Sequence, residues 1–368
     1  MNVTEKLRQI LALRMLKNMG GKAFQNGLTA FGSIEGMLSA KRKDWKQVEV
    51  LGRLDQGPLS DKAHWNAVDK EIEFAAVNKV SFVTFFDESY PSLLKEIYDP
   101  PVLLYVQGNL PKSSEVCLAV IGSREASLHG LEMARVMGRD LAAAGAVVVS
   151  GLARGIDSAA HRGALEADGR TIGVLGCGLS RMYPPENKKL AEEITRKGAL
   201  ISEFLMKEGP NLHHFPMRNR IISGMSRGLV VVEAREKSGA LITVGCALEQ
   251  GRDVYVLPGN AGSKKTLGSN ELLKQGAIFV TDASDVLVDF GITMKKKTSA
   301  RSGIQSFELS KEESDLLRLL DCAESLQLDE IVEKSSFSPQ KTMTLLTALA
   351  VKGAVRELPG KYFLEVEG

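Results

Sequence analysis

The feature that most constrains the fold of this chain is a repeated alternation of short apolar runs with longer segments of helical character, which begins at Val116. Most of the helical segments end in glycine, the residue that a helix C-terminus prefers. The runs are apolar on both faces, as strands are when helices cover both sides of a parallel sheet. The sequence therefore predicts an α/β fold with a doubly wound parallel sheet. The predicted strands lie at 117–121, 146–149, 171–175, 199–201, 229–232, 253–257 and 277–280.

The length of 368 residues is too great for one ordinary domain, and we predict four parts. Residues 1–75 consist of short helices, and residues 76–292 form the α/β domain. Residues 293–305 are a basic, polar linker, and residues 306–368 form a last small domain. The predicted N-terminal helices lie near 7–19, 27–40 and 62–77.

The last domain has the pattern of a winged helix. Three helical segments precede two strand-like runs, which flank Pro359-Gly360 as a hairpin turn would. Ser338-Pro339 gives the third helix an N-cap and a first-turn proline. Residues 306–368 carry 7 Lys and Arg against 12 Asp and Glu, whereas residues 1–305 carry 40 against 33. The body of the chain is therefore basic and its tail is acidic.

Several classes of protein are excluded by simple observations. No apolar run approaches the roughly 18 residues of a membrane span, and the mean hydropathy is −0.05. The N-terminus mixes charged and apolar residues at helical spacing and has no small-residue cleavage site, so it does not predict a signal peptide. The four cysteines lie far apart, which argues against a disulfide framework or a zinc site. We expect a cytoplasmic protein with no membrane span.

Ligands of an open parallel sheet bind at the loops that follow the carboxyl ends of its strands. We call the six such loops of this chain the phosphate shelf. Each contains at least one cation, together with glycines or hydroxyl residues that let backbone amides approach an anion. The shelf cations are Arg124, Arg154, Arg181, Lys207, Arg218, Arg220, Arg235, Lys237, Lys264 and Lys265. This pattern favours a site for phosphates or a polyanion, and the alternative is the ordinary scatter of cations over a protein surface.

The sequence does not match the known motifs for dinucleotide binding, nucleotide hydrolysis or a serine nucleophile. The first loop lacks the G-x-G-x-x-G of a dinucleotide site, and the segment 259–266 has Lys264 where a P-loop needs its second glycine. Ser226 lies in a G-x-S-x-G sequence but precedes a strand, whereas a nucleophile elbow follows one. Asp157 and His161 are four residues apart, and we interpret them as capping and packing a helix start. We predict no catalytic residue, no metal site and no cofactor.

Long motifs of the α/β region resemble the DprA/Smf family, the DNA-processing proteins of natural transformation. The resemblance covers roughly residues 80–285 and follows the family's order of motifs, including the upstream segment 87–109. The motifs are AVIGSREAS (119–127), VVSGLARGIDSAAHRGAL (148–165), GVLGCGLSRMYPPEN (173–187), ISEF (201–204), FPMRNRIISGMSRGLVVVEAREKSGALIT (215–243), ALEQGRDVYVLPG (247–259) and GSNELLKQGA (268–277).

This resemblance implies an extended Rossmann-like domain that binds single-stranded DNA without sequence specificity. Members of the family are also known to bring the RecA recombinase to that DNA, to form homodimers and to lack established catalysis. For this chain, the resemblance implies that it protects incoming single strands and helps to load RecA on them during natural transformation and recombination. Residues 1–75 are similar to the degenerate helix-hairpin-helix or SAM-like region of relatives.

By the same resemblance, the DNA contacts come from the phosphate shelf. Single-stranded DNA needs a cationic groove for its phosphates and flat side chains for its unstacked bases. The guanidinium fork of arginine fits phosphate, and Phe215 is placed to stack on a base. The alternative for Phe215 is a core position beneath the Arg-Asn-Arg loop. The expected DNA-binding residues are Gly122, Ser123, Arg124, Gly151, Arg154, Phe215, Arg218, Asn219, Arg220 and Lys264.

Two other functions stay open at this stage. One is a nucleotide N-glycoside hydrolase of a related Rossmann-like family, although neither 238–243 nor 256–262 matches the PGGxGT-type loop of such enzymes. The other is a nucleotide-binding sensor without chemistry. Nucleotides would compete with an oligonucleotide for one site in the sensor, and a nucleotide hydrolysis assay would reveal the enzyme.

The acidic winged-helix domain leads to a first prediction. Phosphate contacts supply most of the non-specific affinity for DNA, and the presumed recognition helix has only Lys341 and Lys352 as cations. We therefore expect this domain to have a protein-docking or regulatory role rather than to bind DNA. The isolated fragment 306–368 is expected not to bind duplex DNA at physiological salt in a fluorescence anisotropy titration, and duplex binding by this fragment would contradict the assignment.

Overall fold

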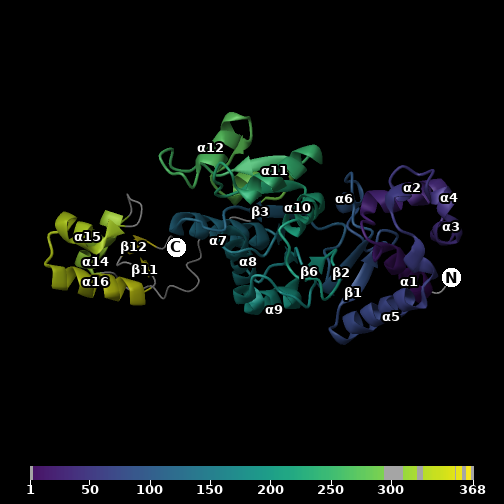
Figure 1. The fold of residues 1–368 in the computed structure, drawn as a ribbon. Coiled ribbons are helices and arrows are strands. Elements are labelled where there is room, and N and C mark those ends of the chain that lie inside the picture. The colour runs from purple at the N-terminus through teal and green to yellow at the C-terminus, as the bar shows by residue number, and fades with distance from the viewer. Residues whose placement is uncertain (1–2, 294–309, 321–325, 353, 359–361, 366–368) are drawn as a thin grey trace. The chain divides into compact units, whose positions relative to one another are not determined.

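The computed structural model of the protein divides into two compact units, residues 1–294 and 295–368 (Figure 1). No helix in the described part of the chain is long and apolar enough to cross a membrane. The predicted linker, from residue 294 on, and the predicted turn at Pro359-Gly360 lie outside the described residues. The described residues are 3–293, 310–320, 326–352, 354–358 and 362–365.

The first unit begins with helices, as predicted, but their bounds differ. α2 ends where Gly32 adopts a φ of 75°, and the hydroxyl of Ser33 then caps α3. The single helical stretch predicted near 27–40 therefore belongs to two helices. The N-terminal elements are α1 (Val3–Arg14), α2 (Gly21–Phe31), α3 (Ile34–Ser39), α4 (Arg42–Trp45), the 3₁₀ helices η1 (Leu51–Arg53) and η2 (Gly57–Ser60), and α5 (Lys62–Val77).

The sheet of the first unit has nine strands in the order β1-β2-β6-β5-β4-β3-β7-β8-β9. Only the pairs β1–β2 and β2–β6 are antiparallel. The chain moves outward in one direction from β3 to β6 and in the other from β7 to β9, which confirms a doubly wound, mostly parallel sheet. The strands are β1 (Ser81–Thr84), β2 (Leu103–Gly108), β3 (Cys117–Ile121), β4 (Val147–Ser150), β5 (Thr171–Val174), β6 (Ala199–Ser202), β7 (Gly228–Val231), β8 (Asp253–Val256) and β9 (Ile278–Phe279).

Helices cover both faces of the sheet, which explains why its strands are apolar throughout. In β3, Leu118 and Val120 pack in one buried cluster with residues of α7 and α8, whereas Ala119 and Ile121 face a second cluster that contains residues of α10 and α11. The helices of this region are α6 (Ser92–Lys95), α7 (Leu128–Ala143), α8 (Ile156–Glu166), η3 (Pro185–Asn187), α9 (Lys188–Lys197), α10 (His214–Met225), α11 (Gly239–Glu249), α12 (Leu267–Lys274) and α13 (Ala283–Val288).

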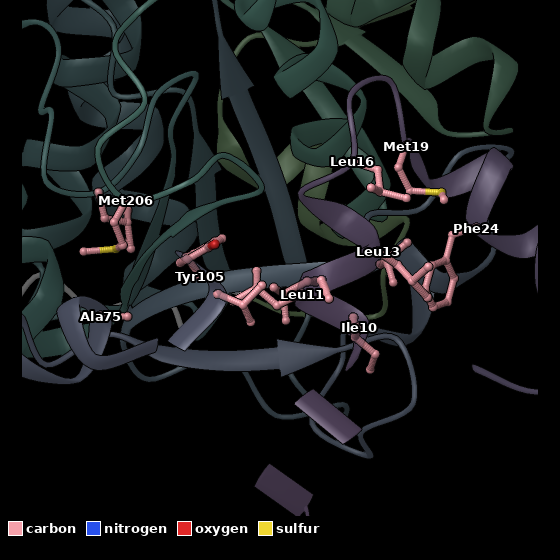
Figure 2. Packing of buried hydrophobic residues seen from close by; sticks show 14 of the residues in the cluster. Ile10, Leu11, Leu13, Leu16, Met19, Phe24, Ala75, Tyr105 and Met206 are labelled. Atoms are coloured by element: carbon pink, nitrogen blue, oxygen red, sulfur yellow. The ribbon is translucent and has the colours of Figure 1, made fainter. Parts of the chain in front are cut away.

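The N-terminal helices share a buried cluster with the sheet. Figure 2 shows Leu11 and Leu13 of α1 together with Tyr105 of β2, and Met206 belongs to the same cluster. The predicted domain boundary at residue 75 falls inside α5. Apolar residues on both sides of that position pack together, so residues 1–294 form one compact unit, and the boundary itself stays a prediction.

The second unit contains a three-stranded antiparallel sheet and three helices, as a winged helix requires. The hydroxyl of Ser338 accepts a hydrogen bond from the Lys341 amide, and Pro339 begins α16, as the sequence predicts. The elements are α14 (Lys311–Leu320), β10 (Leu326–Gln327), α15 (Leu328–Lys334), α16 (Pro339–Val351), β11 (Val355–Leu358) and β12 (Tyr362–Glu365), and the strand order is β10-β12-β11.

The close packing of α7 on α8 leads to a second prediction. A Cβ atom at Gly163 would lie 1.8 Å from the carbonyl oxygen of Arg135, so Gly163→Ala must push two backbones apart. We expect the free energy of unfolding to fall by about 1–3 kcal/mol. Gly245→Ala is the control, because no atom lies within 4 Å of its Cβ position, and loss of a glycine within a helix is expected to stabilise by about 0.4–1 kcal/mol. Urea denaturation of both variants tests this difference, and equal stabilities would contradict it.

Candidate nucleic-acid interface

A pocket of about 350 Å³ opens at the carboxyl end of β3. It is formed where the loop after β3 meets the first turns of α10 and α11. Its position is the one expected for ligands of a doubly wound sheet. Its lining consists of Ile121, Gly122, Ser123, Arg124, Glu125, Ala153, Asp157, Leu212, Phe215, Pro216, Arg218, Asn219, Ile222, Arg235, Ser238, Gly239, Ala240, Ile242 and Thr243.

The loop after β3 is held by close backbone contacts. A Cβ atom on Gly122 would lie 2.6 Å from Cγ1 of Ile156 and 2.8 Å from the carbonyl oxygen of Glu233, so only glycine fits. The amide of Ser123 donates to that same carbonyl oxygen at 2.7 Å. The amide of Ile156 in turn donates to the Ser123 carbonyl at 3.2 Å. The loops that follow β3, β4 and β7 are thereby joined into one rigid floor.

The loop after β4 has an unusual backbone. Leu152 has a φ of 53°, and Gly155 has φ 76° and ψ −129°. Such conformations persist only where the surroundings impose them, and they cluster at functional sites. The carboxylate of Asp157 accepts hydrogen bonds from the amides of Gly151 at 3.1 Å and Ala153 at 3.4 Å. Burial raises the pKa of Asp157, while the nearby charge of Arg218 and these hydrogen bonds act in the opposite direction.

Arg218 lies inside the protein and supports the same loop. Its side chain comes from α10, and the residue is only 4% exposed. Its Nη1 atom donates to the carbonyl oxygens of Gly151 and Val174, both at 2.6 Å. Burial lowers the pKa of Arg218 to about 10, and Asp157 opposes this shift, so the guanidinium is charged at neutral pH. Arg218 therefore joins the ends of two strands beneath the pocket.

Arg124 and Phe215 present a cation and an aromatic ring on the pocket wall. The guanidinium carbon of the exposed Arg124 lies 5.0 Å from the centroid of the Phe215 ring. The ring also lies 5.9 Å from that of Tyr183, measured between centroids. Phe215 is half-buried, so it is partly accessible on the pocket lining while it packs on Gly176. Leu212 and Ile242 extend the apolar rim, at 83% and 46% exposed.

The structure brings together six of the ten expected DNA-binding residues on the pocket lining. Gly151 lies directly behind them, in contact with the Arg218 guanidinium. Asn219 is 8% exposed, and its amide approaches the Gly239 carbonyl at 3.5 Å. The six are Gly122, Ser123, Arg124, Phe215, Arg218 and Asn219.

Besides Gly151, three expected residues lie outside the pocket lining. Arg220 points away from it and forms ion pairs with Glu203 at 2.6 Å and with Asp99 at 3.3 Å. Arg154 is exposed and forms an ion pair with Glu186. Lys264 is exposed in the loop after β8. The Arg-Asn-Arg sequence is therefore not one cationic surface, because its two arginines leave α10 in different directions.

The structure also adds pocket residues that sequence reasoning did not assign. Ser238 caps α11 by accepting a hydrogen bond from the Ala240 amide at 3.2 Å, and Ser238, Gly239 and Ala240 all line the pocket. Arg235, a shelf cation, lies beside them and pairs with Glu125 at 2.8 Å. The available signal was the Ser-Gly-Ala sequence at a predicted helix start, which follows a strand and so falls on the same edge of the sheet.

The titratable residues near the pocket have structural partners. His161 is fully buried with Nδ1 at 2.6 Å from Oγ1 of Thr171, and burial lowers its pKa to about 3, so it is neutral. The carboxylate of Glu233 accepts hydrogen bonds from the amide and hydroxyl of Ser127. Among the described residues, no group of three or more His, Cys, Asp or Glu side chains is arranged to hold a metal ion.

Comparison with known proteins identifies the family. Residues 81–291 match the model of the family described as DNA recombination-mediator protein A, and residues 304–361 match the DprA winged helix domain. The chain belongs to the DNA recombination-mediator protein A family. This confirms the resemblance of its motifs to DprA/Smf proteins and the winged-helix assignment of its C-terminal domain.

Individual relatives agree with this assignment. The chain is 38% identical over 280 residues to protein Smf of Escherichia coli, which covers 75% of each chain. It is 44% identical over 207 residues to DNA processing protein DprA of Streptococcus pneumoniae, which covers 56% of this chain and 73% of that protein.

Two solved structures are similar to this fold. The structure of Streptococcus pneumoniae DprA has a TM-score of 0.64 at 34% identity and covers 78% of this chain and 99% of that one. A structure of DNA processing protein A from Helicobacter pylori, which concerns its single-stranded DNA binding mode, has a TM-score of 0.51 at 29% identity. It covers 57% of this chain and 95% of that one.

Proposed function

We propose that this protein binds single-stranded DNA without sequence specificity, with phosphates at the pocket after β3 and bases on its aromatic and apolar rim. The observation that carries the proposal is the juxtaposition of an exposed Arg124 with the Phe215 ring above the rigid floor formed by the loops after β3, β4 and β7. Phosphates are bound by arginine and by amides at helix starts, and unstacked bases stack on aromatic rings. The single-stranded DNA binding of the Helicobacter pylori relative supports the same assignment.

The biological role that we infer is protection of incoming single strands and assistance in loading RecA on them during natural transformation and recombination. The family description, a recombination mediator, supports a partnership between DNA and a recombinase. The excess of cations over residues 1–305, 40 against 33 acidic residues, favours attraction of a polyanion to this part of the chain.

We further propose that the protein acts without catalysis. The carboxylates that line the pocket are Asp157 and Glu125. Asp157 holds two backbone amides, and Glu125 pairs with Arg235, so both have structural partners. The nucleotide hydrolase and the nucleotide sensor stay alternative predictions.

We also propose a homodimer. β9 is the last strand of the sheet, and its residues Ile278 and Phe279 are 39% and 57% exposed. Apolar side chains on a free sheet edge are a template for association with a second copy of the chain.

Single-stranded DNA binding is expected to depend on Arg124. Loss of a charged hydrogen bond in Arg124→Ala should weaken binding by about 1.5–3 kcal/mol, roughly 10- to 150-fold. The slope of log affinity against log salt should also fall by about 0.7 for each phosphate contact that is lost. Fluorescence anisotropy with a labelled oligonucleotide measures both quantities, and a duplex competitor tests the preference for single strands.

The matched control is Arg227→Ala. Arg227 is also exposed, but it precedes β7 and so lies at the opposite edge of the sheet from Arg124. Equal losses in both variants would contradict a pocket-specific role. Competition of mononucleotides with the oligonucleotide would favour the nucleotide sensor, and hydrolysis of mononucleotides would favour the enzyme. In the same samples, RecA's DNA-dependent ATP hydrolysis should begin sooner with the unmodified protein than with Arg124→Ala.

The homodimer is expected to depend on the free edge of the sheet. Phe279→Lys places a charge on β9 and should convert the dimer to a monomer, which light scattering after gel filtration would reveal. Val77→Lys is the control, because Val77 is 81% exposed at the end of α5. A dimer that persists in Phe279→Lys would show that another surface joins the copies.

A further inference from the structure

A second surface with aromatic rings and lysines lies between the N-terminal helices and the segment that follows β1. Three cations each lie over one ring. The distance from Nζ of Lys22 to the centroid of the Tyr98 ring is 4.3 Å. The corresponding distance is also 4.3 Å for Lys6 and the Phe86 ring, and it is 4.8 Å for Lys95 and the Phe85 ring. We call these six residues the aromatic–lysine surface.

Neighbouring contacts join the three pairs into one surface. Phe85 and Phe86 have ring centroids 5.9 Å apart, and the buried Phe24 lies 6.4 Å from Phe86. Lys95 and Tyr98 are three residues apart in the sequence, so the Lys95–Phe85 and Lys22–Tyr98 pairs meet at the end of α6. The backbone of Lys22 is also tied to this segment, because its amide donates to the carboxylate of Asp99 at 2.7 Å.

The surface is accessible and cationic. Tyr98 is 78% exposed and Phe86 is 36% exposed, so both rings are accessible from solvent. Within the part of the chain that the structure describes, none of the three lysines forms an ion pair with a carboxylate. Glu5 is adjacent to Lys6 and Glu96 to Lys95 in the sequence, and among the described residues neither carboxylate forms an ion pair with its neighbouring lysine. Each lysine therefore keeps its ammonium donors for a ligand.

The surface is connected to the pocket through α10. The first turn of α10 carries Phe215, and its middle carries Arg220, which pairs with Asp99 next to Tyr98. Five residues of helix separate Phe215 from Arg220, a rise of roughly 7.5 Å. In Figure 1, α6 lies between α10 and α2, and Gly224 of α10 packs against Leu94 of α6. These contacts place α10 between the pocket and the aromatic–lysine surface.

We propose that the aromatic–lysine surface is a second contact for single-stranded DNA, which binds the continuation of the strand held at the pocket. The proposal rests on the proposed function of that pocket. Ammonium groups over aromatic rings offer a strand both of the contacts it needs, a cation for each phosphate and a ring for an unstacked base. A duplex has stacked bases and offers no base face to the rings, so the expected ligand is a single strand.

The test compares short and long oligonucleotides on the full chain. Sites of this kind cover roughly 4–16 nucleotides, so we would use single strands of about 6 and about 20 nucleotides. Lys22→Ala/Tyr98→Ala should bind the short strand as the unmodified protein does and the long strand about 5- to 150-fold more weakly, from the loss of one stacked base. For this double variant and the long strand, the slope of log affinity against log salt should fall by about 0.7. Tyr98→Phe, which keeps the ring, should bind both strands normally.

Lys341→Ala is the matched control, because Lys341 also lies over a ring, that of Phe337 at 5.1 Å, but in the C-terminal unit. Thermal melting of each variant verifies folding. Unchanged binding of the long strand, or an equal loss on both strands, would overturn the proposal while leaving DNA binding at the pocket intact. Absence of binding by the unmodified protein would instead reject the function of the pocket, and this proposal with it.

Discussion

The charge of Arg218 lies inside the protein, and the carboxyl edge of the sheet depends on how that charge is satisfied. A buried cation is costly unless it is paired and hydrogen-bonded. Here two carbonyl oxygens accept from it, and the equally buried Asp157 supplies the opposite charge. Asp157 also holds the amides of the strained loop after β4, so the hydrogen bonds of Arg218 and Asp157 together fix the backbone on which the pocket is built.

Above this floor, the pocket wall has a cationic part and an aromatic and apolar part. The exposed guanidinium of Arg124 suits phosphates, whereas Phe215 and the apolar rim suit bases. Because Arg124 lies over the Phe215 ring, the two parts meet at one place. The aromatic–lysine surface repeats this combination on α1, α2, α6 and the segments that follow β1 and α6. A polymer with alternating charge and flat rings fits such a repeated arrangement better than a single small molecule does.

The sequence placed loops more reliably than it placed side chains. The Gly-Ser-Arg loop lies at the carboxyl edge of the sheet, as expected, because that edge follows from strand direction alone, and its contact with DNA stays a prediction. Arg218 and Arg220 were both assigned to the same surface, yet residues two apart on a helix of 3.6 residues per turn point about 200° apart. Arg218 therefore faces the floor, and Arg220 faces Glu203 and Asp99. The start of α11 at Ser238 was not assigned.

The sequence by itself determined those elements of this protein that depend on residues close together in the chain. The apolar runs, glycine-ended helices and the Ser338-Pro339 cap specify strands and helices through interactions within a few residues, and they sufficed for the fold class. Only the tertiary structure decided the pairing of Arg220 with Asp99, the close approach of Gly122 to Glu233, and the cluster that joins α1 to β2. Those contacts join segments far apart in the sequence, and their partners are chosen by packing and desolvation of the whole fold, which no local pattern encodes.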